Sequence, residues 1–168
     1  MIRKDMRKAV TFIVVTSLAS LFAFCLGGNS REISGFPIVW FLVAYSLAVQ
    51  VIVFIPALIY NTEKYYDLTG SFTFFSITLI SLFTNPHLVT KQVIAGAMVC
   101  IWCLRLGYFL FTRILKAGED SRFVAIKKTK LRFFYAWFIQ GLWVVVTSGP
   151  LLAILTTNVQ LSNSFNLI

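Results

Sequence analysis

The sequence is poor in charged residues, in cysteine and in histidine. Charged side chains make up 12% of the 168 residues, against about 25% in a soluble globular protein. Three cysteines and one histidine provide neither the pairs of a disulfide scaffold nor the ligands of a zinc module. A disordered chain needs low hydrophobicity, whereas 58% of this chain is apolar or aromatic. What remains is a helical membrane protein.

The charges that are present are mostly basic. Fifteen Lys and Arg against six Asp and Glu give a formal net charge of +9. On a soluble protein this balance suggests a nucleic-acid partner. The sequence has no soluble nucleic-acid-binding module, so we expect no nucleic-acid partner. The bilayer offers another explanation, because cytoplasmic loops of membrane proteins are rich in Lys and Arg.

Hydrophobic runs predict five membrane spans. A span needs about 20 mostly apolar residues, and the candidates are residues 10–26, 38–60, 64–84, 93–115 and 131–155. The third is the weakest, because its clean apolar run, 72–83, is only about 18 Å long as a helix. It must include residues 64–71 to span. We therefore predict an all-α polytopic helix bundle forming a single membrane domain over residues 1–168.

The basic residues predict the orientation of this bundle. With the N-terminus inside, twelve of the fifteen fall in inside segments, two in outside loops, and Arg105 within a span. This bias is typical of a cytoplasmic N-terminus, in a bacterial inner membrane or the endoplasmic reticulum. It also supports the third span, whose removal would place the basic segment 113–132 outside. Residues 122–132 are expected to contact anionic lipid headgroups.

Arg105 is the charge that this topology does not explain. It lies eight residues before Arg113, hence about 12 Å deeper in the membrane, too deep to reach the surface easily. We expect it to face the bundle interior or a watery cavity and to have an acidic partner. The nearest candidate is Asp67, with Glu63 just below it. A structural ion pair and a functional pocket both remain open.

Other polar residues within the spans favour structural roles. Gln50 with Ser46, and Gln140 with Thr147, predict hydrogen bonds between helices, with a polar-ligand lining as the alternative. Cys100 and Cys103 form a C-x-x-C pattern on an apolar helix without a second pair. We interpret them as small buried residues and expect no metal. His87 lies in an outer turn without a nucleophile, and residues 116–123 form a solvated turn.

Three strings carry a family resemblance. They are EKYYDLTGS at 63–71, RLGYFLFTRILKAGEDSRF at 105–123 and LRFFYAWFIQGLWV at 131–144. Together they resemble an uncharacterised family of multipass membrane proteins related to steroid 5-alpha-reductases, over roughly residues 38–158. The resemblance implies a helical membrane enzyme that uses NADPH to reduce a conjugated carbon–carbon double bond in a lipid, such as a steroid or an enoyl compound.

The resemblance also implies candidate site residues. Those bordering the lipid-facing, catalytic cavity are Tyr66, Asp67 and Arg105, and those near the cofactor NADPH are Lys116, Asp120 and Arg122. Arg122 is expected to face phosphate, because a guanidinium binds phosphate oxygens in pairs. Tyr65 or Tyr66 could supply the proton that accompanies hydride transfer.

The family pattern continues beyond the fifth span. A histidine, proline, asparagine and tyrosine stretch, followed by glycine and glutamate, holds most cofactor-binding groups there, whereas this chain stops at NVQLSNSFNLI. We expect an N-terminal half that is inactive alone, and whose partners are membrane lipid, a lipid or steroid-like substrate and a missing C-terminal half or partner chain. The alternatives are a noncatalytic helix-bundle subunit and a component of lipid or solute transport.

Overall fold

The fold is an all-α bundle with one small hairpin. A computed structural model describes residues 2–157. Its helices are α1 (Ile2–Gly27), α2 (Ile38–Ile59), α3 (Tyr66–Phe83), α4 (Thr90–Ala117), α5 (Ser121–Ile126) and α6 (Lys130–Thr156), and its strands are β1 (Glu32–Ile33) and β2 (Phe36–Pro37). All of these helices except α5 are long and apolar enough to cross a membrane. The predicted polytopic helix bundle is confirmed.

The helix boundaries agree with the predicted spans to within a few residues, apart from the start of α1. The weak third span does include residues before the clean apolar run, since α3 begins at Tyr66. Its 18 residues make it about 27 Å long. The expected turn at 116–123 is narrower than predicted, because α4 continues to Ala117 and α5 starts at Ser121. Gly118 makes this turn with a φ of 78°, which glycine adopts without strain.

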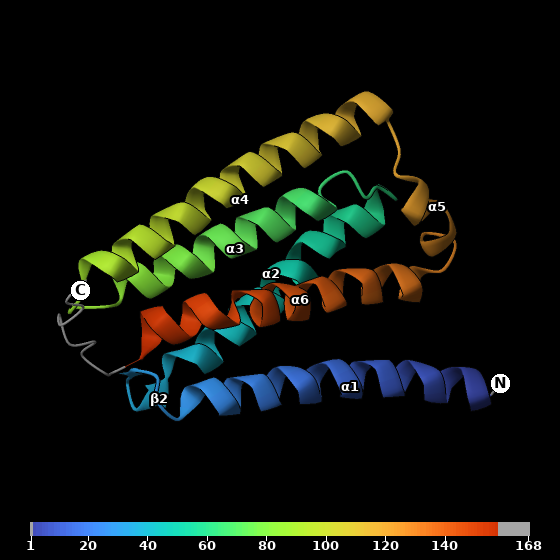
Figure 1. Cartoon of the computed structure of the whole chain (residues 1–168). Coiled ribbons are helices and arrows are strands. Elements are labelled where there is room, and N and C mark those ends of the chain that lie inside the picture. Colours follow the sequence, from blue (N-terminus) through green and yellow to red (C-terminus); the bar gives the residue numbers. More distant parts are fainter. Residues whose placement is uncertain (1, 158–168) are drawn as a thin grey trace, which may run out of the picture.

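Helix α6 runs through the middle of the bundle, where it contacts α1, α2 and α3 (Figure 1). Helix α4 packs mainly on α3 along one outer edge, and α1 lies along the opposite edge. The start of α1, the α2–α3 connection and α5 share one end of the bundle, called here the basic end. The segments predicted to carry the twelve inside cations all lie at this end, whereas the β-hairpin and the α3–α4 turn lie at the other, the hairpin end.

Small residues let α2 and α6 approach closely. The Ser46 hydroxyl on α2 donates to the carbonyl oxygen of Gly141 on α6 at 2.9 Å. The amide of Gln50 donates across to Thr73 Oγ1 on α3 at 3.1 Å, and that of Gln140 to the Tyr66 carbonyl at 3.1 Å. The predicted interhelical hydrogen bonds of both glutamines are therefore confirmed. Thr147, by contrast, bonds to carbonyls of its own helix.

The hairpin end is closed by side chains that cap helix carbonyls. Arg31 donates to the carbonyls of Ser81 and Thr84 at the end of α3. Asn85 donates to the Leu155 carbonyl at 3.2 Å, and Gln92 to the Ile154 carbonyl at 2.7 Å, both near the end of α6. Because the last carbonyls of a helix lack partners within it, these donors tie the end of α6 to the α3–α4 turn and the start of α4, and the end of α3 to the segment that holds Arg31.

The α2–α6 contact leads to a stability prediction. A Cβ added at Gly141 would lie 3.0 Å from Leu47 Cδ2 and 3.2 Å from the Leu47 Cα, so the helices must separate. Gly141→Ala is expected to lower the free energy of unfolding in detergent by about 1–3 kcal/mol. Gly28→Ala is the control, since nothing lies within 4 Å of its added Cβ. Equal effects of the two substitutions would show that this contact is not tight.

Candidate functional site

A buried carboxylate organises the basic end. Glu63 lies in the α2–α3 connection and is 4% exposed. Its Oε1 accepts a hydrogen bond from the backbone N–H of Asp120 at 2.9 Å, and its Oε2 lies 2.7 Å from Lys127 Nζ. The same ammonium group lies 3.1 Å from Glu119 Oε1. Glu63 therefore holds the segment between α4 and α6 against the start of α3.

The contacts of Glu63 determine its ionisation. Burial raises the pKa of its carboxyl, but the hydrogen bonds from Lys127 and from the Asp120 backbone outweigh this, so the pKa is lowered. Burial likewise opposes the charge of Lys127, but its hydrogen bonds to Glu63 and Glu119 leave its pKa raised. Both groups are therefore charged near neutral pH.

Four further charged residues form what we call the ionic cluster. They come from three helices and the loop before α5, and are Asp67, Arg113, Asp120 and Arg122. Arg122 Nη2 lies 2.6 Å from Asp120 Oδ2 and 3.3 Å from Asp67 Oδ2. Arg113 Nη2 lies 3.5 Å from the same Asp67 oxygen and 4.0 Å from Asp120 Oδ2. Two carboxylates and two guanidinium groups thus neutralise one another.

The Asp120 carboxylate has a second role as the N-cap of α5. It accepts a hydrogen bond from the Arg122 backbone N–H at 2.9 Å, which is the usual way to begin a helix. The Arg122 side chain also bonds both carboxylate oxygens. The side-chain hydrogen bond from Arg122 lowers the pKa of Asp120, and the same bond raises the pKa of Arg122.

Tyr66 connects the ionic cluster to the aromatic core. Its ring packs edge-on against Phe123 of α5, with centroids 4.8 Å apart, and against Trp137 of α6, at 5.3 Å. Its hydroxyl donates to the Ala136 carbonyl at 3.1 Å. Tyr66 and Asp67 are adjacent in the sequence, but their side chains contact different surroundings. Tyr66 faces the core, while Asp67 faces the cations.

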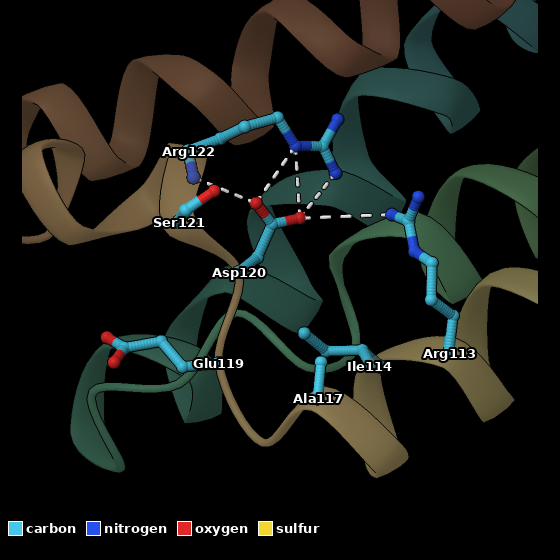
Figure 2. Close-up of a pocket in the computed structure, with 7 residues that line it drawn as sticks. All are labelled: Arg113, Ile114, Ala117, Glu119, Asp120, Ser121 and Arg122. Carbon is cyan, nitrogen blue, oxygen red and sulfur yellow. Dashed lines mark hydrogen bonds and ion pairs between the residues drawn. The ribbon is translucent and has the colours of Figure 1, made fainter.

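A pocket of about 330 Å³ opens beside the cluster. Figure 2 shows Arg113 and Arg122 reaching Asp120 from two sides. The residues that line the pocket are Arg113, Ile114, Ala117, Glu119, Asp120, Ser121 and Arg122. The Arg113 and Arg122 side chains are half exposed, at 50% and 57%.

Two other pockets flank the start of α3. An apolar groove of about 330 Å³ lies between α2 and α3, lined by Val53, Tyr65, Leu68, Thr69 and Phe72. A pocket of about 280 Å³ lies between α3 and α6, lined by Tyr66, Asp67, Ile139, Gln140 and Trp143. Consecutive residues of α3 therefore reach different surroundings, apolar on one side and charged on the other.

The structure corrects the expected partner of Asp67. Arg105 has an exposed side chain and no ion pair with any residue between 10 and 157, and Asp67 instead pairs with Arg113 and Arg122. Arg105 is eight residues before Arg113 on α4, hence about 12 Å away along the axis and turned by about 80° around it. It faces neither the bundle interior nor the cavity that we predicted.

The other candidates fall into two groups. Asp67, Asp120 and Arg122 lie together in the ionic cluster, with Tyr66 next to them, whereas Lys116 is exposed in the last turn of α4 and does not line the pocket. Arg113 and Lys127 were counted only as topological charges. The sequence identifies Arg113 and Lys127 as partners only indirectly. Most acidic residues are in segments at the basic end, and each of them needs a nearby cation.

The fold and the cluster define a class: a multipass helix bundle whose loops at one end are held by buried and partly buried ion pairs. Over residues 53–167 the chain matches the family described as "Protein of unknown function (DUF1295)". The chain belongs to this family, and the match includes α3 to α6 and the whole ionic cluster. No curated protein and no solved structure matches the chain. The relation to steroid 5-alpha-reductases stays a prediction.

The Glu63–Lys127 pair leads to a second stability prediction. Glu63→Gln leaves the Lys127 ammonium with weaker partners in a largely buried position, so we expect a loss of about 3 kcal/mol in the free energy of unfolding. Glu119→Gln removes the other carboxylate of the same lysine, whose side chain is 57% exposed. This control should cost under about 1 kcal/mol. Similar losses in both variants would contradict the central role of Glu63.

The lowered pKa values predict acid sensitivity. A carboxyl group whose pKa is lower in the folded state stabilises the fold above its unfolded pKa of about 4, and that stabilisation disappears as the pH falls through the folded value. Glu63 and Asp120 are such groups. We expect the free energy of unfolding to be level from pH 5 to 8 and to fall below pH 4. Glu63→Gln should make this acid slope shallower, and an unchanged slope would contradict the assignment.

Proposed function

We propose that this chain is part of an integral membrane oxidoreductase that uses NADPH to reduce a carbon–carbon double bond of a lipid. The resemblance described above motivates this proposal. The proposal further holds that these 168 residues alone are inactive. Membership of the DUF1295 family is compatible with it, since that family has no assigned activity.

The observation that carries the proposal is the proximity of apolar and charged sites at the first turns of α3. Tyr65 and Leu68 line the apolar groove, while Tyr66 and the charged Asp67 line the neighbouring pocket between α3 and α6. The groove has the chemistry to take the apolar body of a lipid from the bilayer. A reaction between a lipid and a water-soluble reductant requires such a place, where hydrocarbon and charged surface adjoin.

The choice between the two tyrosines as proton donor follows from their contacts. The Tyr66 hydroxyl already donates to the Ala136 carbonyl, and its ring is held within the aromatic core. Tyr65 is 50% exposed and lines the groove. A general acid must reach the atom that it protonates, so Tyr65 is the better candidate in this chain.

The residues of this chain do not fit a whole NADPH molecule. The charges of the ionic cluster sum to zero, and Glu119 adds a carboxylate to the pocket that a polyanion would enter. The pocket volume of about 330 Å³ is at the lower limit for ligand sites. NADPH, when bound, supplies hydride. We therefore propose that it is held mainly by groups outside these residues, with Lys116, Asp120 and Arg122 at most at its edge.

The noncatalytic alternative also has an observation in its favour. Every acidic group near the pocket already has a basic partner at hydrogen-bond or ion-pair distance. Such a network can serve stability alone. The two functions differ in whether any form of the protein binds NADPH.

NADPH titration tests the proposal. The nucleotide is added to the purified 168-residue chain in detergent and, separately, to the product of the complete reading frame, and binding is followed by nucleotide fluorescence. We expect no saturable binding to the 168 residues and saturable binding to a longer product. If the product of the complete reading frame does not bind NADPH, the reductase proposal is wrong. If the 168 residues alone bind NADPH, the proposal that they cannot hold the cofactor by themselves is wrong.

A further inference from the structure

One face of α4 is covered by no other helix of the described chain. Along the middle of this face, exposed residues recur at alternating intervals of four and three, and they are Ile94, Met98, Ile101, Arg105, Tyr108 and Leu115. Thr112, which is half-buried, fills the remaining position of the pattern. We call this set the α4 stripe. Further exposed apolar residues border this stripe, namely Val93, Trp102, Leu104 and Phe109. Alternating spacings of four and three are typical of the seam between two packed helices.

Arg105 lies in the middle of the α4 stripe. Since α4 runs from Thr90 to Ala117, Arg105 is roughly 22 Å from its first residue and 18 Å from its last. Neighbours on the stripe are strongly exposed, with Ile101 at 67% and Tyr108 at 75%. An unpaired arginine at this depth in hydrocarbon is expensive, and neither end of the helix is close enough for its side chain to reach water easily.

Within residues 10–157, no carboxylate side chain lies at this depth. Five of the chain's six acids are in segments at the basic end, and Glu32 is in the hairpin. Asp5 precedes the first apolar span, and the other four acids at the basic end are Glu63, Asp67, Glu119 and Asp120. Each of these four is engaged in the ion pairs already described. A carboxylate for Arg105 must therefore come from another polypeptide segment.

Exposure alone is not evidence for a partner, as α1 shows. Its outer face is also exposed, with Leu21 at 58% and Phe24 at 73%, but its apolar segment Val10–Gly27 contains no Asp, Glu, Lys or Arg. Lipid acyl chains suffice to cover such a face. The α4 stripe differs because acyl chains cannot satisfy a guanidinium group.

We propose that the α4 stripe binds a transmembrane helix that carries an aspartate or glutamate opposite Arg105. A second copy of this chain is a poor occupant, because a symmetric contact through the same stripe would bring the two Arg105 side chains together. The partner is therefore a helix of different sequence. This inference does not depend on the reductase proposal, because it rests on the charge and depth of Arg105.

Synthetic transmembrane peptides provide the test. A leucine–alanine peptide with one central glutamate is compared with peptides that have glutamine or lysine at that position, in phosphatidylcholine vesicles containing the 168-residue chain. Binding is measured by energy transfer between labels. We expect the glutamate peptide to bind about tenfold more tightly than the glutamine peptide. Equal binding of these two peptides would overturn the proposal.

Variants locate the effect on the stripe. Arg105→Leu should abolish the preference for glutamate, Arg105→Glu should transfer it to the lysine peptide, and Lys116→Leu, near the end of the same helix, should leave it unchanged. A photoreactive residue at Ile101 should capture the glutamate peptide, whereas one at Leu21 on α1 should not. The assignment of the binding site to the α4 stripe would be wrong if Arg105→Leu kept the preference for the glutamate peptide. It would also be wrong if Ile101 and Leu21 captured this peptide equally.

Two measurements separate the proposal from other roles of Arg105. Arg105→Leu should leave the thermal unfolding midpoint of the isolated chain unchanged or higher, because no described residue pairs with the arginine; a clear decrease would indicate an internal structural partner instead. The binding assay is repeated with phosphatidylserine in the vesicles. If anionic lipid abolishes the glutamate preference, a lipid headgroup is the ligand of Arg105 and the helix proposal is wrong.

Discussion

A polar group in hydrocarbon has no water to bind, and this constraint explains the polar contacts of the bundle. Many hydroxyl groups within the spans return to their own helix: Thr73 bonds the Thr69 carbonyl, and Ser81 the Ile77 carbonyl, each at 2.7 Å. The longer amides of Gln50 and Gln140 reach neighbouring helices instead. Since each group left unpaired costs several kcal/mol in lipid, helix packing must bring these partners together.

The same constraint acts most strongly on α3, which is the least apolar of the candidate spans, with a mean hydropathy of 1.2. It is fixed at both ends by charge. Asp67 in its first turn binds two arginines, and the carbonyls of its last turn accept from Arg31. Along its length, Gly107 of α4 lets Ser71 approach closely. The span that hydrophobicity supports least is thus held by specific polar contacts at both ends.

Much of this fold could be predicted from the sequence, because hydrophobic runs and basic loops record the bilayer directly. The ion pairs could not. Several arginines of α4 and α5 are candidate partners for Asp67. Which of them pair with it depends on the rotation of α4 about its axis and on the position of α5. The capping role of Asp120 is a local pattern, an acid two residues before the basic Arg122, and was within reach. The contacts of Gln92 with the end of α6 join residues 62 positions apart, which no local pattern reveals.

Two arginines on α4 therefore have opposite situations, although they differ by only eight positions. Arg113 is level with Asp67 of α3 and pairs with it, and its charge is neutralised within the chain. Arg105 is about two turns deeper and turned outward, where lipid offers it nothing. No carboxylate within residues 10–157 pairs with Arg105, so the compensating contact that we propose comes from another helix. The outer face of α4, with Arg105 near its middle, is accordingly where we propose that a membrane helix of another polypeptide binds.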